Sequence, residues 1–192
     1  MTADLTPTQE QMRELLHREA IRDCLFRYCR GADRCDRALL RSAFWPEATD
    51  SHAMPGRAPI NAHEFIERVL PKLRAMDQAQ HTLGNILIEL EGDRARVESY
   101  YNAYHRVRDA AGVARDIVTA GRYLDRFERR DGHWRIADRV VLVDWFREFA
   151  DSADWQRGVF GGPCAMGAKW PEDISYGFLG ARVFAGPGSG VE

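Results

Sequence analysis

Apolar residues in the first third of the chain recur at steps of three and four, which is the spacing of a helix that buries one face. This pattern predicts a first helix that begins at the N-cap Thr6 and ends at Gly31. It also predicts a short second helix over 37–44 and a third over 62–76. Pro71 lies inside the third pattern, where a proline is expected to kink or divide the helix.

From residue 80 onward the apolar period shortens from about 3.6 towards 2, which indicates strands. Four long strands are expected, over 80–90, 95–107, 115–129 and 133–145. The short connections between them contain Gly and Asp, which tight hairpin turns favour. Helices first and hairpins second predict an α+β fold. In it a curved antiparallel sheet forms a cone-shaped barrel around an apolar cavity, with the N-terminal helices packed on its concave side.

The last part of the chain differs in composition, because glycines alternate there with aromatic residues. We therefore expect a cone-shaped α+β domain over 1–147 and a Gly- and aromatic-rich extension over 148–192. A chain of this composition is expected to pack onto another surface. The extension would cover the mouth of the cavity or lie across a neighbouring subunit.

Composition and charge exclude several classes of protein. Of the 192 residues, 45% are hydrophobic and 29% are charged, which is typical of a folded chain rather than a disordered one. The net charge of −2 offers no basic excess, so no nucleic-acid partner is expected. No apolar stretch reaches the roughly 20 residues of a membrane span, and the polar N-terminus does not resemble a signal peptide. A cytoplasmic protein is expected, with its four cysteines reduced and serving as packing residues.

The sequence contains no nucleotide-binding or metal-binding motif, so neither a cofactor nor a metal is expected. The candidates for chemistry are instead polar residues at positions where the apolar pattern predicts burial. Tyr28 continues the apolar face of the first helix, and Asp33 follows where the chain turns inward. Alternatively, Tyr28 lies at the edge of the core and Asp33 caps the next helix.

His81 lies near the start of the first predicted strand and shares a face with Leu83, Asn85 and Leu87. A carboxylate beside a histidine fixes its tautomer, raises its pKa and makes it a base near neutral pH. Without such a carboxylate, His81 would be a hydrogen-bonded residue of the core.

Arg139 lies in the last predicted strand and shares a face with Val141, Val143 and Trp145. A guanidinium among apolar neighbours is costly unless it meets an anion. The anion would be a group on a substrate or an internal Asp or Glu, and the pattern leaves both open.

Four segments carry a resemblance to a known family: RYCRGADRCD, LLRSAFWPEA, QHTLGNILIEL and ERRDGHWRIADR. Over about residues 8–147 the chain resembles the SnoaL-like branch of the nuclear-transport-factor-2-like superfamily. Members of this branch form cone-shaped α+β barrels. They include scytalone dehydratase, bile-acid 7α-dehydratase and hexachlorocyclohexane dehydrochlorinase, which are cofactor-free lyases.

The resemblance implies roles for the residues named above. In those enzymes an Asp after the first helix and a His on a strand form a dyad, and Asp33 and His81 match these positions. Tyr28 matches a Tyr of the bile-acid enzyme, and Arg139 matches a last-strand Arg of the dehydrochlorinase. His81 would therefore be the base and Asp33 its partner. Tyr28 would donate a hydrogen bond to a developing oxyanion or leaving oxygen, and Arg139 would bind negative charge.

Three further residues are expected to contact the substrate: His52, Asn85 and Trp145. His52 stands where scytalone dehydratase has a Tyr that holds the leaving water. The group that contacts the leaving group is therefore expected to differ from the one in that enzyme.

The resemblance implies a cofactor-independent, dehydratase-like lyase that acts on a hydrophobic cyclic or aromatic small molecule. Isomerisation and C–C-cleaving deformylation of an aromatic alcohol need the same groups and remain open. Two alternatives come from other classes, a non-catalytic ligand-binding or assembly domain and the small subunit of a ring-hydroxylating dioxygenase. A homo-oligomer, dimer or trimer, is expected, because the convex face of a curved sheet often needs covering.

Overall fold

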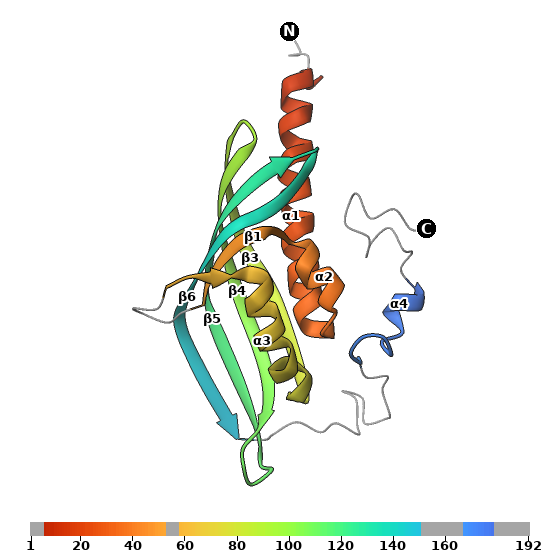
Figure 1. The fold of residues 1–192 in the computed structure, drawn as a ribbon, viewed down its shortest axis with the longest axis vertical. Helices are drawn as coiled ribbons and strands as arrows, with labels where there is room; N and C mark the ends of the chain where they lie inside the picture. Colours follow the sequence, from red (N-terminus) through yellow and green to blue (C-terminus); the bar gives the residue numbers. More distant parts are fainter. Residues whose placement is uncertain (1–5, 53–57, 151–166, 179–192) are drawn as a thin grey trace.

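The computed structural model describes residues 6–52, 58–150 and 167–178. In chain order the elements are α1 (Gln9–Arg34), α2 (Arg37–Ser42), β1 (Phe44–His52), β2 (Ile60–Asn61), α3 (Ala62–Ala75), β3 (Gln78–Glu91), β4 (Arg94–Arg108), β5 (Ala114–Arg130), β6 (His133–Ala150) and α4 (Ser175–Phe178). The strands form one curved sheet in the order β2-β1-β6-β5-β4-β3, and α1, α2 and α3 pack on its concave side (Figure 1). The predicted α+β fold is thus confirmed, with a sheet that stays open between β2 and β3.

The first helix begins and ends later than its pattern predicts. Thr8 rather than Thr6 is the N-cap, because its hydroxyl accepts the Gln11 backbone N–H and the Gln11 side chain accepts the Thr8 backbone N–H. The helix ends at Arg34, and its C-cap Cys35 adopts the left-handed conformation with a φ of 54°. Asp33 therefore lies in the last turn of α1 and not after it.

Gly31 is not the stop of α1 but a point where α2 packs closely against it. A Cβ atom on Gly31 would lie 2.7 Å from the backbone nitrogen of Leu40, so only a glycine lets the two helices meet here. The second helix ends at Ser42, and Phe44 already begins β1. Polar residues interrupt the apolar pattern of β1, and the sequence analysis missed this strand.

The third helix runs through Pro71 without a break. Pro71 is exposed, and the backbone carbonyl it leaves unbonded, that of Glu67 one turn earlier, lies on a helix face that water reaches. Pro71 therefore does not divide the helix.

The predicted meander of four long antiparallel strands is confirmed, and its last strand extends five residues beyond residue 145. Asp131 and Gly132 have φ values of 50° and 80°, as the tight turn between β5 and β6 requires. β1 adds a strand parallel to β6 on the other side. This arrangement leaves β3 at one edge of the sheet and brings β1 near the other.

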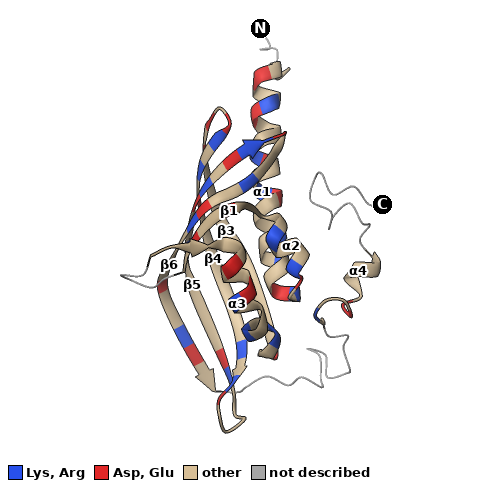
Figure 2. Ribbon diagram, in the orientation of Figure 1, with Lys and Arg blue, Asp and Glu red and all other residues tan. Residues whose placement is uncertain are grey.

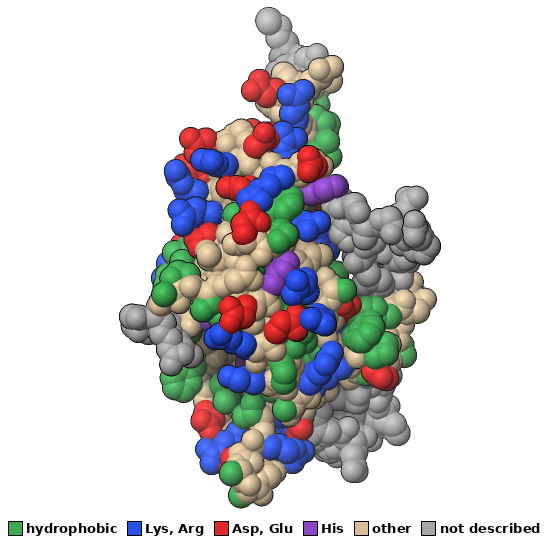
Figure 3. Space-filling model, viewed as in Figure 1, with side chains coloured by type: hydrophobic (Ala, Val, Ile, Leu, Met, Phe, Trp, Pro, Cys, Tyr) green, Lys and Arg blue, Asp and Glu red, His purple; other side chains and the backbone are tan. Residues whose placement is uncertain are grey.

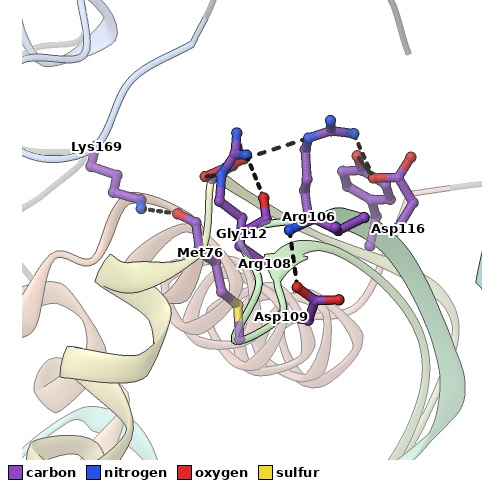
Figure 4. Close-up of polar contacts among 10 residues, drawn as sticks. Met76, Arg106, Arg108, Asp109, Gly112, Asp116 and Lys169 are labelled. Atoms are coloured by element: carbon purple, nitrogen blue, oxygen red, sulfur yellow. Dashed lines mark hydrogen bonds and ion pairs between the residues drawn. The ribbon is translucent and has the colours of Figure 1, made fainter. Parts of the chain in front are cut away.

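The described part of the extension, residues 167–178, packs against the ends of α1 and α3. The Trp170 backbone N–H donates to the Arg34 carbonyl at 2.7 Å, and the Tyr176 hydroxyl donates to Asp36 at 3.0 Å. The Lys169 ammonium donates to the Met76 carbonyl, near the network of Arg106 and Asp116 on β4 and β5 (Figure 4). Most of the extension lies outside the described residues, so its covering of the cavity or a subunit stays a prediction.

Charged residues of both signs alternate along the exposed parts of the helices and strands (Figure 2), and they are interspersed with other side chains on the face shown in Figure 3. Cys24, Cys29 and Cys35 are free and buried, while Cys164 lies outside the described residues. Among the described helices, none has the length and apolarity needed to cross a membrane.

Candidate functional site

Asp33 and His81 form a hydrogen-bonded pair between α1 and β3. The Asp33 Oδ1 atom lies 2.7 Å from Nδ1 of His81. The His81 backbone N–H also donates to both carboxylate oxygens of Asp33, at 2.9 and 3.1 Å. This N–H is free for Asp33 because β3 is an edge strand, where every second backbone group points away from the sheet. The pair that the family resemblance implied is therefore formed.

The pair is shielded from solvent, and its geometry selects one tautomer of His81. The side chains of His81 and Asp33 are 9% and 13% exposed. A carboxylate at Nδ1 favours a proton on that nitrogen, which leaves the lone pair of Nε2 as the basic site. The His81 ring lines a cavity, so a base faces the space in which a small molecule could lie.

The cavity beside His81 has a volume of about 250 Å³ and lies between the helices and the concave face of the sheet. Most of its lining is apolar, and the part contributed by α3 and β6 consists of Phe65, Ile66, Val69, Leu73, Val141 and Val143. The polar groups that reach it include Tyr28, His52, His81 and His105. An apolar chamber with a few polar groups is the usual form of a small-molecule site.

Two larger hollows, of about 440 and 590 Å³, lie over charged strand positions such as Glu89, Arg96 and Arg126. Among the described residues, no histidine lines either hollow. We therefore place the site at the smaller cavity, where the titratable groups meet apolar walls.

Tyr28 lines the cavity as part of an aromatic cluster with Tyr101 and Tyr123. The rings of Tyr28 and Tyr123 meet edge to face at 5.7 Å, and those of Tyr101 and Tyr123 stack at 4.5 Å. Burial raises the pKa of Tyr28 well above its ordinary value, so its hydroxyl keeps its proton. Tyr28 can donate a hydrogen bond inside the cavity.

His105 on β4 also lines the cavity, and its ring meets that of His81 edge to face at 5.4 Å. Burial and the nearby His81 lower the pKa of His105 to about 4, so this imidazole is neutral near neutral pH. The sequence analysis gave His105 no role. The feature that could have identified His105 is its position in the alternating series with Tyr101 and Ala103, which line the same wall of the cavity.

Arg139 is fully buried and paired with Asp125 on β5. Its guanidinium donates two hydrogen bonds to the carboxylate, from Nε and Nη2, each at 2.7 Å. It also lies between the rings of Tyr28 and Tyr123, at 4.1 and 4.2 Å from their centroids. Of the two predicted partners, the internal carboxylate is the one present. Arg139 does not line the cavity.

His52 lines the cavity from β1, as predicted, and it brings an unexpected partner. Its Nδ1 atom lies 2.6 Å from Oδ1 of Asp50, whose side chain is fully buried. The sequence analysis missed Asp50 because β1 was not predicted, and a strand would have placed Asp50 and His52 on one face.

Asn85 and Trp145 do not line the cavity. The register of β3 shifts between Leu83 and Ile86, so Asn85 is exposed. The register of β6 shifts between Val143 and Trp145, so Phe146 rather than Trp145 lies opposite the cavity residue Thr119. A bulge inserts one residue and reverses the alternation beyond it, which the pattern alone does not reveal.

Among the described residues, no group of three His, Cys, Asp or Glu side chains is arranged to hold a metal ion. The polar groups at the cavity are instead suited to acid–base chemistry: two histidine–carboxylate pairs, a neutral imidazole and a tyrosine hydroxyl.

Comparison with known proteins agrees with this architecture. A model of the SnoaL-like domain family matches residues 13–140. No curated protein matches the chain.

Several solved structures share the fold. One is a hexachlorocyclohexane dehydrochlorinase, LinA type 2, with 21% identity and a TM-score of 0.63 over 72% of this chain and 93% of that chain. A scytalone dehydratase-like protein from Novosphingobium aromaticivorans has 21% identity and a TM-score of 0.62, covering 80% and 96%. A protein from Kribbella flavida has 17% identity and a TM-score of 0.63, covering 70% and 95%.

Proposed function

Since this chain belongs to the SnoaL-like domain family, we propose that it is a cofactor-independent lyase that removes water from a small cyclic or aromatic alcohol. The observation that carries the proposal is the shielded His81–Asp33 pair at the wall of an apolar cavity. The dehydrochlorinase and the scytalone dehydratase-like protein that share the fold are consistent with elimination chemistry.

In the proposed reaction, Nε2 of His81 removes a proton from a carbon next to an activating group such as a carbonyl. Asp33, 2.7 Å from Nδ1, stabilises the imidazolium that forms. The Tyr28 hydroxyl donates a hydrogen bond to the oxygen on which negative charge develops. A general base contributes typically about 10²–10⁴-fold in rate, and a donor at a developing anion contributes a comparable factor.

Arg139 supports this reaction without touching the substrate. Its guanidinium is neutralised by Asp125 and packs on the Tyr28 ring, so its role is to hold that ring in place. Tyr123 covers the other face of the guanidinium.

The cavity limits the size of the substrate. Its volume of about 250 Å³ lies below the usual range for drug-sized ligands, about 300–1,000 Å³, while a dry cavity of about 150 Å³ accepts benzene. One ring, or two fused rings with few substituents, matches this space.

The test is a panel of small β-hydroxy ketones: β-hydroxycyclohexanone, β-hydroxyindanone and β-hydroxypropiophenone. Loss of water yields a conjugated enone that is followed by its absorbance. Release of formaldehyde from β-hydroxypropiophenone would reveal C–C cleavage instead, and a β,γ-unsaturated cyclohexenone tests isomerisation.

His81→Ala is expected to lower kcat/KM by about 10²–10⁴-fold, because the base is lost. The control is His133→Ala, at the first residue of β6 and outside the cavity. A His81→Ala variant that keeps its activity contradicts the proposal. So does a wild-type protein that binds the compounds and leaves all of them unchanged, as a ligand-binding domain would.

A further inference from the structure

His52 and Asp50 form a second histidine–carboxylate pair at the same cavity. Nδ1 of His52 lies 2.6 Å from Asp50, and the His52 ring stacks on Phe65 of α3 with centroids 4.1 Å apart. The carboxylate and the aromatic face fix the orientation of the ring. This leaves Nε2 as the nitrogen that can meet a molecule in the cavity, whose wall includes His52.

The two pairs lie towards opposite ends of the strand order and reach the cavity from there. His81 lies on β3 and His52 on β1, and the strands β4, β5 and β6 lie between them in the sheet order. The carboxylates also come from different elements, Asp33 from α1 and Asp50 from β1 itself. A molecule in the cavity therefore has the His81 imidazole on the side of β3 and the His52 imidazole on the side of β1.

Asp50 belongs to a buried row of charges that crosses three strands. The register places it opposite Arg139 on β6, and Arg139 lies opposite its partner Asp125 on β5. Two carboxylates and one guanidinium leave a net charge of −1 in a region shielded from water. Buried charge is costly unless it is balanced, and His52 is the group bonded to Asp50 that can carry a balancing proton.

The other proton-bearing groups of the cavity are less suited to protonating a leaving group. The pKa of His105 is lowered to about 4, so at neutral pH this ring holds no extra proton. Burial raises the pKa values of Tyr28, Tyr101 and Tyr123, so these hydroxyls give up a proton reluctantly. His81 is needed in its basic form.

We propose that His52 is the general acid that protonates the departing hydroxyl, with Asp50 as its positioning residue, so that the site is built for alcohols. The inference rests on the proposed elimination. In one turnover Nε2 of His81 takes the proton from carbon, the C–H electron pair forms the C=C bond, and the C–O bond breaks. The proton on Nε2 of His52 passes to the departing oxygen and gives water. Proton exchange with solvent restores both rings.

The experiment compares two leaving groups on one carbon skeleton. The probes are the β-hydroxy ketone of the panel that reacts fastest and its acetate ester. The leaving group of the ester is acetate, a stable anion that departs without needing a proton. His52→Gln is expected to lower kcat/KM for the alcohol by about 10²–10⁴-fold and for the ester by less than about 10-fold. Asp50→Asn is expected to show the same selectivity with a smaller loss.

Two reference variants complete the design. His81→Gln is expected to lower the rates for both probes alike, because the carbon proton must be removed in each case. His133→Gln, outside the cavity, is expected to change neither. Circular dichroism and thermal melting identify variants that lose activity by unfolding, and the ester rate of His52→Gln is itself an internal measure of an intact site.

An equal loss for alcohol and ester in a folded His52→Gln variant overturns the assignment of His52 and leaves the proposed elimination standing. A wild-type protein that converts no member of the panel overturns the proposed function and this inference with it.

Discussion

Burial and the His81 ring lower the pKa of His105 to about 4, whereas a histidine in an unfolded chain titrates near 6.5. Between these values the unfolded state binds more protons than the folded state, so the free energy of unfolding falls as the pH falls from about 6.5 to 4. We expect the wild type to lose about 2 kcal/mol more than His105→Gln between pH 7 and pH 5.

The measurement is urea denaturation of both proteins at the two pH values. Taking the difference between wild type and variant removes the contribution of the other groups that titrate in this range. His133→Gln, at the first residue of β6 and outside the cavity, is the control for replacing a histidine elsewhere in the fold. Parallel pH dependences of wild type and His105→Gln would contradict the burial argument.

Individual site residues were predictable where a polar side chain interrupts an apolar pattern. Tyr28 and His81 line the cavity, as that reasoning expects, whereas the bond between Asp33 and His81 was implied by the family resemblance. The apolar pattern left two partners open for Arg139, a substrate anion and an internal carboxylate. A pattern within one strand does not show which carboxylate lies on the next strand. His105 was missed although its alternation was visible.

At the scale of the element, Gly31 controls the packing of α2 on α1. In an open helix a change from Gly to Ala gains up to about 1 kcal/mol of helix propensity. At Gly31 the added Cβ would meet the Leu40 backbone nitrogen at 2.7 Å and its Cγ at 2.9 Å, and overpacking costs about 1–3 kcal/mol. The net effect of Gly31→Ala is expected to be a loss of stability.

Thermal melting measures this loss, and Gly177→Ala is the matched control. Gly177 also lies in a helix, but a Cβ there meets no atom of the described residues within 4 Å. We expect Gly31→Ala to lower the melting temperature and Gly177→Ala to leave it within error. A melting temperature of Gly31→Ala at or above that of the wild type would show that α2 moves aside at no cost.

Elements with strong periodicity were predictable, and irregular ones were not. The helices and the four meander strands follow from the spacing of apolar residues, with end points wrong by a few residues. β1 carries Pro46, Glu47 and Asp50, which interrupt any alternating signal. It is stabilised by pairing with β6, a partner far along the chain, and its own sequence does not show this pairing. The bulges near Asn85 and Trp145 changed which side chains face the cavity, and only the pairing of the strands reveals them.

At the scale of the whole molecule, the described residues leave the far end of β6 incompletely covered in one copy of the chain. β1 ends opposite Val141, and beyond this point β5 is the one described strand that pairs with β6. The same stretch exposes Val143, Trp145, Phe146 and Phe149. An unpaired strand edge with exposed aromatic residues is a template for association.

We therefore expect a homo-oligomer that associates through this end of β6. Light scattering coupled to size-exclusion chromatography should give the mass of a dimer or trimer at micromolar concentration. The double variant Phe146→Lys with Phe149→Lys should run as a monomer with an unchanged far-ultraviolet spectrum, because both side chains are exposed in the single chain. Leu87→Lys, equally exposed on the opposite edge strand β3, should keep the wild-type mass. A wild type that is monomeric at all concentrations contradicts association, and a double variant that stays oligomeric moves the interface to another surface.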